Sequence, residues 1–110
     1  MRVITGIIVV LLAGCALTPY ECRTVGVDVP DSAEKTGTIV SEQTGTPAEV
    51  KAKCMKPFTN DDKGCAIPVG EHQYKLWYIA DGNIRDHERC HAKFETKAHC
   101  VHNDSRRGIK

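Results

Sequence analysis

The feature that most constrains this chain is its apolar N-terminus, because it takes residues out of the fold. A short basic start, Met1-Arg2, leads into an almost wholly apolar run from Val3 to Ala13. A stable membrane-spanning helix needs about 20 apolar residues, so this run is too short to span a membrane but has the length of a signal-peptide core. We expect residues 1–14 to be a signal peptide, and removing 14 of the 110 residues leaves a mature chain of 96.

The apolar run ends in Leu12-Ala13-Gly14-Cys15, which resembles the lipobox of bacterial lipoproteins. The resemblance covers the first fifteen residues and implies that Cys15 receives lipid, whose acyl chains then anchor the protein to a membrane without a transmembrane helix. Ala16 follows the cysteine. In lipoproteins of Gram-negative bacteria an aspartate there usually means inner-membrane retention, so its absence implies the periplasmic side of the outer membrane if the host has one. An ordinary secretory signal is the alternative.

The charge balance of the mature chain gives no reason to expect a nucleic-acid partner. The full sequence has a formal net charge of +1, and removing Arg2 with the signal peptide brings it to zero. Binding to nucleic acid depends on a basic surface, and a chain without net charge offers no such electrostatic basis.

Six cysteines in an exported chain predict disulfides. With Cys15 lipidated, five remain, so one is left over after two bridges. We expect one bridge between Cys54 and Cys65 across a short loop, and a second from Cys22 to either Cys90 or Cys100. Two bridges would help a domain of this size, whose hydrophobic core is modest.

The mature chain is expected to be a lipidated tether over residues 15–23, followed by a single small α+β domain over residues 24–110. Alternating or β-branched segments predict strands over residues 24–29, 37–40, 65–69 and 71–80, although the polar stretch 30–46 is also compatible with a loop. In the last strand both faces carry bulky side chains, which favours a central position in the sheet.

Two helices are expected. Thr46-Pro47-Ala48-Glu49 has the residues of a capping box with proline in the first helical position, so a helix should run from there to about Cys54 or Met55. Asp81-Gly82-Asn83 ends the last strand, and a second helix should start with Asn83 as its cap and extend into the high nineties.

The second helix carries His87-Glu88-Arg89-Cys90-His91, which fits the HExxH pattern of zinc peptidases. Two histidines four residues apart lie on one face of a helix about one turn apart, so both rings can reach one metal ion. Glu88 lies at the edge of that face, where it can act as the general base that takes a proton from an activated water. The spacing predicts one Zn²⁺ held by His87 and His91.

Residues Gly64 to His99 are similar to a loose group of small HExxH peptidases with a Gly-Cys-Ala strand start, a second strand, the motif and a later histidine. Several members are lipoproteins encoded by phages, plasmids or bacterial chromosomes. The resemblance covers about a third of the chain. It implies a zincin-like fold with a short antiparallel sheet before the HExxH helix, and hydrolysis of peptide or protein in the cell envelope.

The third protein ligand of such a zinc ion is open at this stage. Phe94 and Lys97 stand where the metzincin pattern has glycine and histidine, and no later glutamate suits the gluzincin pattern. We expect His99 to be the third ligand, provided that the chain turns back after about Lys97. His102 and Asp104 are the alternatives. Nothing selects an oxyanion-stabilising residue among His72, Tyr74 and Tyr78.

Two other interpretations stay open. The cysteines and histidines near the C-terminus could form a closed structural zinc site, with ligands drawn from Cys90, His91, His99, Cys100 and His102. The chain could also be a non-enzymatic, disulfide-stabilised lipoprotein of the cell envelope with a binding or structural role, or a phage- or plasmid-encoded lipoprotein that modifies the envelope.

Overall fold

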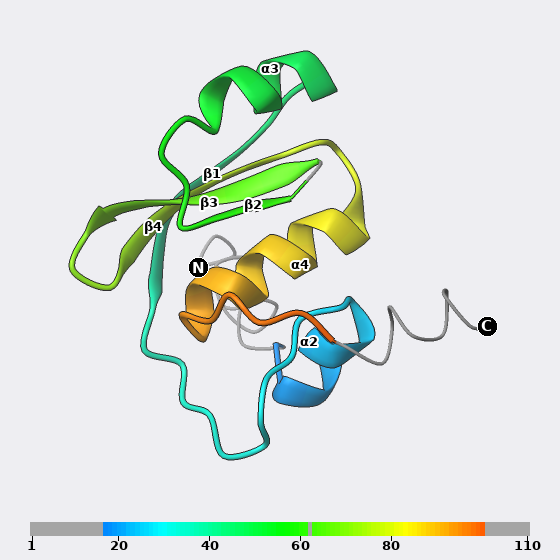
Figure 1. Ribbon diagram of the computed structural model, residues 1–110, viewed down its shortest axis with the longest axis vertical. Helices are drawn as coiled ribbons and strands as arrows, with labels where there is room; N and C mark the ends of the chain where they lie inside the picture. Colours follow the sequence, from blue (N-terminus) through cyan, green and yellow to red (C-terminus); the bar gives the residue numbers. More distant parts are fainter. Residues whose placement is uncertain (1–16, 62, 101–110) are drawn as a thin grey trace, which may run out of the picture.

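A small mixed sheet lies at the centre of the protein, and helices cover both of its faces (Figure 1). The computed structural model describes residues 17–61 and 63–100. The expected α+β class is confirmed in these residues. The elements follow one another as α2 (Pro19–Thr24), β1 (Thr38–Thr44), α3 (Pro47–Lys53), β2 (Thr59–Asp61), β3 (Gly64–Gly70), β4 (Gln73–Tyr78) and α4 (Gly82–Lys93).

The sheet has the strand order β1-β4-β3-β2. Strands β2, β3 and β4 form an antiparallel meander, but β1 pairs in parallel with β4. The expectation of a purely antiparallel sheet is therefore wrong. The parallel pairing arises because the connection through α3 and the β2–β3 hairpin brings β4 back beside β1 in the same direction. The central position expected for the last strand is confirmed.

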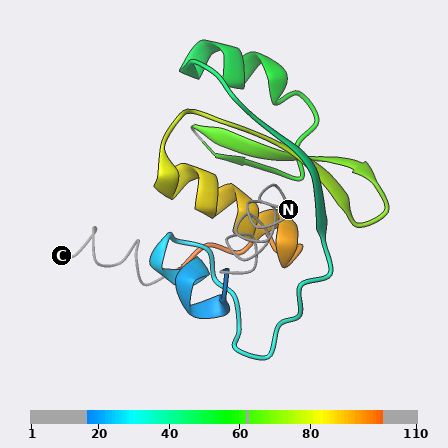
Figure 2. The same cartoon turned by 180° about the vertical axis from the view of Figure 1, so that it is seen from behind.

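The two faces of β4 bury different side chains, as its alternating pattern requires. Tyr74, Leu76 and Tyr78 pack with Ala66 and Ala92 in the core between the sheet and α4. On the opposite face, a core under α3 contains Trp77 and Ile79 together with Val50 and the two cysteines of one disulfide. The views from front and back both show α3 and α4 on opposite faces of the sheet, with α2 beyond α4 (Figures 1 and 2).

Within the segment expected to be a tether, residues 19–23 belong to a short helix packed on the domain. Thr18 caps α2 by accepting a hydrogen bond from the Glu21 N–H, and Pro19 occupies the first helical turn. Cys22 is fully buried in a third core with Val27, Val29, Cys90 and Phe94. The strand expected at residues 24–29 is not formed. In this segment a single antiparallel bridge joins Val27 to His99.

The helix α4 begins and ends earlier than expected. Asp81, not Asn83, is the N-cap, and its carboxylate accepts from the N–H groups of Asn83 and Ile84. The helix ends at Lys93, with Phe94 as C-cap, and Glu95 adopts the left-handed conformation (φ 48°). The Glu95 carboxylate bonds to the side chains of Thr36, His72 and Tyr74, and these bonds hold the turn. The helix therefore ends through contacts with other parts of the chain, without a glycine at the turn.

Two disulfides fasten the helices to the rest of the domain. Cys54–Cys65 links the end of α3 to β3, as expected, and Cys22–Cys90 links α2 to α4, which is one of the two pairings left open for Cys22. The buried Cys100 thiol lies 3.6 Å from the Arg23 carbonyl oxygen. Cys15 lies outside the described residues, among which no helix is long and apolar enough to cross a membrane.

Candidate metal centre

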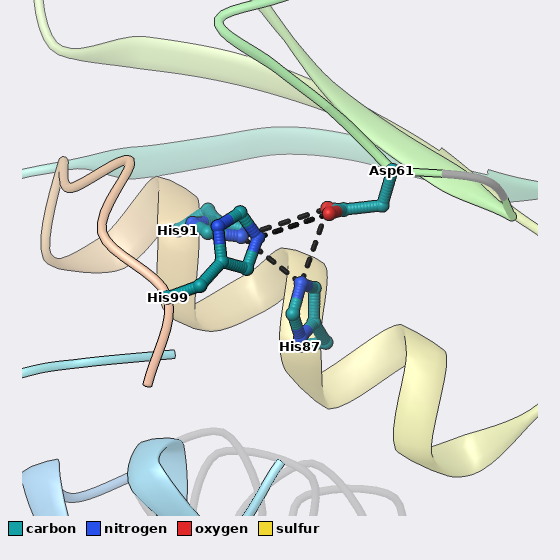
Figure 3. A group of neighbouring side chains, drawn as sticks. All are labelled: Asp61, His87, His91 and His99. Atoms are coloured by element: carbon teal, nitrogen blue, oxygen red, sulfur yellow. Dashed lines mark hydrogen bonds and ion pairs between the residues drawn. The ribbon is translucent and has the colours of Figure 1, made fainter. Parts of the chain in front are cut away.

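Four side chains from three parts of the chain converge at one point between α4 and the edge of the sheet (Figure 3). His87 and His91 come from α4, His99 from the segment after it, and Asp61 from the end of β2. One nitrogen or oxygen atom of each lies within 4.8 Å of the corresponding atoms of the others. This group could hold a metal ion.

The two helix histidines face each other through the same ring nitrogen. The Nε2 atoms of His87 and His91 are 3.1 Å apart, as their spacing of four residues on one helix face requires. Each outer nitrogen is held by the main chain: Nδ1 of His87 donates to the Val25 carbonyl at 2.7 Å, and Nδ1 of His91 donates to the Thr96 carbonyl at 2.8 Å. These bonds orient both rings toward one point.

The two carbonyl bonds also decide which nitrogen carries the proton. A carbonyl oxygen can only accept, so both Nδ1 atoms bear hydrogen and both Nε2 atoms of the neutral rings carry lone pairs. Two lone pairs that face each other at 3.1 Å repel unless a cation lies between them. Backbone bonds to the outer nitrogen of a histidine are the usual way in which proteins orient metal-binding imidazoles. The arrangement therefore requires a proton or a metal ion.

Asp61 and His99 complete the group. One carboxylate oxygen of Asp61 is 3.1 Å from Nε2 of His87 and 3.6 Å from Nε2 of His91. Its other oxygen is 3.0 Å from Nε2 of His99. The His91 side chain is fully buried, whereas that of His99 is 47% exposed, so one side of the cluster is open to solvent.

Charge in the cluster is balanced by mutual contacts. Burial by itself would raise the pKa of Asp61, but its contacts with His87, His91 and Glu88 and the charge of His87 outweigh it, so the pKa of this carboxyl lies far below its usual range. Burial alone would lower the pKa of His87, but its contacts with Asp61 and the Val25 carbonyl raise it. The site therefore favours a carboxylate surrounded by positive charge.

Glu88 is fully buried beside this cluster. Its Oε1 accepts a hydrogen bond from the Thr59 hydroxyl at 3.3 Å, and its Oε2 has no hydrogen-bond partner among the described residues. Burial, and then the nearby Asp61 carboxylate, raise the pKa of Glu88 to about 10. Gly64 makes room for it, because a Cβ there would lie 2.9 Å from Cγ of Glu88. A divalent cation in the cluster would shift Glu88 toward its ionised form.

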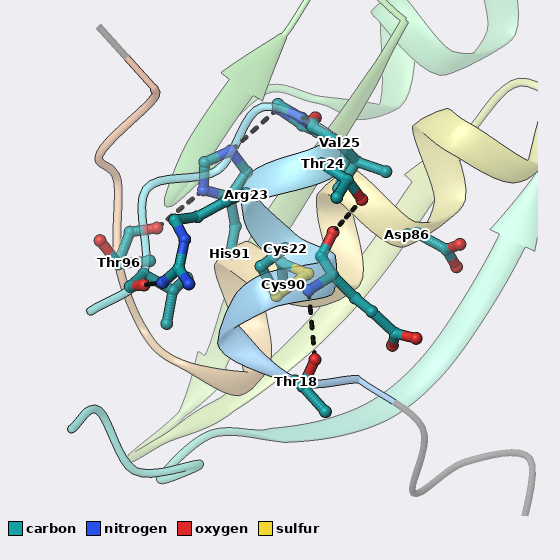
Figure 4. The surroundings of a disulfide bond; sticks show 12 residues. Thr18, Cys22, Arg23, Thr24, Val25, Asp86, Cys90, His91 and Thr96 are labelled. Atoms are coloured by element: carbon teal, nitrogen blue, oxygen red, sulfur yellow. Dashed lines mark hydrogen bonds between the residues drawn. A yellow bond between two sulfur atoms is a disulfide. The ribbon is translucent and has the colours of Figure 1, made fainter. Parts of the chain in front are cut away.

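The segment after α2 supports two of the four side chains. Val25 provides the carbonyl that orients His87. Two residues on, Val27 pairs with His99 through main-chain bonds from Asp28 N–H to the Ala98 carbonyl and from Cys100 N–H to the Gly26 carbonyl, both 3.0 Å. The Cys22–Cys90 disulfide ties the end of α2, from which this segment continues, to α4 beside His91 (Figure 4). We call residues 22–29 the strap.

The structure brings His87, His91 and His99 together, the three histidines expected as ligands. His99 reaches the cluster because α4 ends at Lys93, four residues before the break expected after Lys97. His102 and Asp104 lie outside the described residues. Asp61 was not anticipated, because the segment around it has turn chemistry and nothing in the sequence separates it from the neighbouring Asp62.

Other sequence-level candidates have different roles. Cys90 forms a disulfide, so the closed structural site with Cys90 among its ligands is wrong. The residues considered for oxyanion stabilisation bond elsewhere: His72 and the Tyr74 hydroxyl bond to Glu95, and the Tyr78 hydroxyl donates to Glu42. The carbonyl groups of Val25 and Thr96 leave no signal in the sequence, since any residue can supply them.

A cavity of about 450 Å³ adjoins the cluster and includes two of its members. It is lined by Asn60, Asp61, Lys63, Ile84 and His87. The cavity lies between the end of β2 and α4 near His87, so a ligand there could approach His87 and Asp61 directly.

No family model, no curated protein and no solved structure matches the chain. The function must therefore be argued from the geometry of the cluster.

We predict that metal binding depends on the disulfide of the strap. Replacing Cys22 and Cys90 together by serine should weaken the affinity for added Zn²⁺ by about 10- to 100-fold, because the partners that orient His87 and His99 are then less firmly held. Competition against a chelating indicator measures the change.

The matched control replaces Cys54 and Cys65, whose disulfide lies on the other face of the sheet. This pair should change the Zn²⁺ affinity by less than about threefold, although each bridge contributes about 2–4 kcal/mol to stability. Circular dichroism would establish that both variants are folded. Equal loss of affinity in two folded variants would contradict a special role of the strap.

Proposed function

We propose that this chain is a membrane-anchored lipoprotein with a zinc-dependent peptidase domain of zincin-like design, which hydrolyses peptide or protein in the cell envelope. One observation carries the proposal: Nε2 of His87 and Nε2 of His91 face each other at 3.1 Å with both outer nitrogens bonded to carbonyls. These histidines belong to an HExxH motif whose glutamate is buried next to them.

Zinc is the metal that suits the donor set best. Imidazole nitrogen and carboxylate oxygen are its usual ligands besides thiolate, at about 2.0–2.2 Å. Ligand atoms at those distances in a tetrahedron lie about 3.3–3.6 Å apart. Nε2 of His87, Nε2 of His91 and one Asp61 oxygen are 3.1–3.6 Å from one another, which is near this value. Nε2 of His99 bonds to the other Asp61 oxygen at 3.0 Å, and the four ligand atoms lie within 4.8 Å of one another. Three histidines favour zinc over calcium or magnesium.

Zinc bound at this site would polarise a peptide carbonyl and lower the pKa of a water molecule. Glu88, in its ionised form, would take the proton from that water and pass it to the departing amine. Its burial supports this role, since a carboxylate in a dry setting is a stronger base than one in solvent. Thr59 fixes its position by donating a hydrogen bond to Oε1.

The edge strand β2 supports a peptide as substrate. It pairs with β3 on one side only, so its other edge offers main-chain N–H and C=O groups to an extended peptide. Asp61, at the end of this strand, belongs to the cluster, and the adjoining cavity would receive a substrate side chain. A peptide added to β2 would thus lie beside the histidines.

The proposed anchor would keep this site close to the membrane. The helix α2 begins at Pro19, four residues after Cys15, and four extended residues reach about 14 Å at most. Because the same helix is bonded to α4 through Cys22, the domain has no long spacer before the site. We therefore expect the substrate to lie near the bilayer surface.

A non-enzymatic lipoprotein with a structural metal is the second candidate. It is favoured by the number of donors, since Asp61, His87, His91 and His99 are four and structural zinc sites are closed by four protein ligands. The full burial of Glu88 also fits a purely structural role. The two candidates differ in what the loss of the Glu88 carboxylate does.

We predict that Glu88→Gln binds one zinc per chain but loses peptide hydrolysis by about 10²- to 10⁴-fold, because the general base is removed while the ligands stay. Cleavage of fluorogenic peptides by the purified protein, with zinc measured by mass spectrometry of the metal, tests both parts. The double variant His87→Ala/His91→Ala should lose the zinc as well.

Glu71→Gln is the matched control, because its side chain is 89% exposed in the β3–β4 turn and contacts none of the four cluster residues. It should keep full activity. A wild-type protein that holds zinc but cleaves no peptide would favour the structural candidate, and a folded protein without zinc after zinc is added would refute both.

We also predict that Cys15→Ala abolishes membrane association, because the thiol that receives lipid is lost. Fractionation of expressing cells should move the protein from the membrane to the soluble fraction, and labelling with radioactive palmitate should disappear. A variant that stays in the membrane fraction would contradict the lipid anchor.

A further inference from the structure

The cluster offers four donors, one more than a catalytic zinc site uses. A catalytic zinc site has three protein ligands and an open position, whereas four protein ligands close it. Asp61 makes the fourth donor here. If all four bind at once, no coordination position is left for a water or a substrate carbonyl.

The four donors are not held equally well. His87 and His91 lie on α4, and each has its outer nitrogen bonded to a carbonyl. His99 is held by its main-chain pairing with Val27. Among residues 17–61 and 63–100, nothing gives the Asp61 carboxylate such outer support: its contacts there are to the three histidines, with Glu88 as its other neighbour.

The strand that carries Asp61 is also the least supported in the sheet. Strand β2 has three residues and lies at the edge, paired only with β3 through Thr59, Asn60 and Asp61. Short edge strands with few pairings open at low cost compared with core elements. A small movement of the Asp61 end of β2 would withdraw the carboxylate from the histidines, while Thr59 at the other end keeps its hydrogen bond to Glu88.

Asp61 also occupies the side of the cluster from which a ligand would enter. It lines the cavity together with His87, and its carboxyl lies next to that of Glu88. A water molecule that took the coordination position of Asp61 would therefore lie within reach of Glu88. Asp61 and a reacting water therefore exclude each other.

We propose that Asp61 is a displaceable fourth ligand that keeps the metal centre closed until a substrate takes its place. This inference rests on the proposed function and adds its regulation. A peptide added to the open edge of β2 would meet the strand that carries Asp61, so binding of substrate and release of the ligand occur on the same element.

The experiment uses mature full-length protein in detergent, with Co²⁺ as a spectroscopic probe and azide as a small exogenous ligand. In the wild type, Asp61 competes with azide, which should bind about 10- to 100-fold more weakly than in Asp61→Ala if the centre is closed for 90–99% of the time. Titration of the cobalt visible spectrum with azide measures both affinities. Glu71→Gln, which removes an exposed carboxylate in the β3–β4 turn outside the cavity, should behave as the wild type.

The outcomes separate this inference from the proposed function. Cobalt uptake with equal azide affinity in the wild type and Asp61→Ala would overturn the displaceable ligand and leave the metal centre standing. Loss of cobalt from Asp61→Ala but not from Glu71→Gln would also overturn it, because Asp61 would then be essential for holding the metal. No cobalt uptake by the wild type would overturn the proposed function, and the inference with it.

Discussion

The structure depends on one electrostatic constraint: two imidazole rings on a buried helix face are fixed with their lone pairs toward each other. The Nε2 atoms of His87 and His91 are 3.1 Å apart, and carbonyl groups prevent either ring from turning away. A cation must compensate this repulsion. Several parts of the fold contribute to this cluster. The strap orients His87 and His99, and β2 supplies Asp61. The turn at Glu95 ends α4, so that the chain can bring His99 back to the other histidines.

Local signals predict most of the fold. The Thr46-Pro47 pair with Glu49 predicts α3, whose capping box is present, and the alternation in β4 predicts its central place. The same signal occurs in Thr18-Pro19 with Glu21, where Thr18 does cap α2. The expectation of an extended tether overlooks it, although the sequence carries it. The parallel pairing of β1 with β4 has no local signal, because it depends on how the connection through α3 returns.

For the site, what lies on one helix could be predicted and what depends on tertiary contacts could not. The spacing of His87 and His91 is enough to place both rings on one face. His99 could be expected as a ligand only if the helix ended before it. The helix ends at the left-handed Glu95, whose conformation is stabilised by side chains distant in sequence, and no glycine marks the position. Asp61 comes from a strand 26 residues before His87, in a polar segment where two adjacent aspartates are equivalent in sequence.

The most direct test of this account is a crystal structure of the zinc-loaded protein with anomalous diffraction data on both sides of the zinc absorption edge. The account predicts a single anomalous peak at about 2.0–2.2 Å from Nε2 of His87, His91 and His99, and at a similar distance from a carboxylate oxygen of Asp61. A peak elsewhere, or no peak beside histidines that keep their present arrangement, would mean that the facing nitrogens share a proton and that this cluster is not a metal centre.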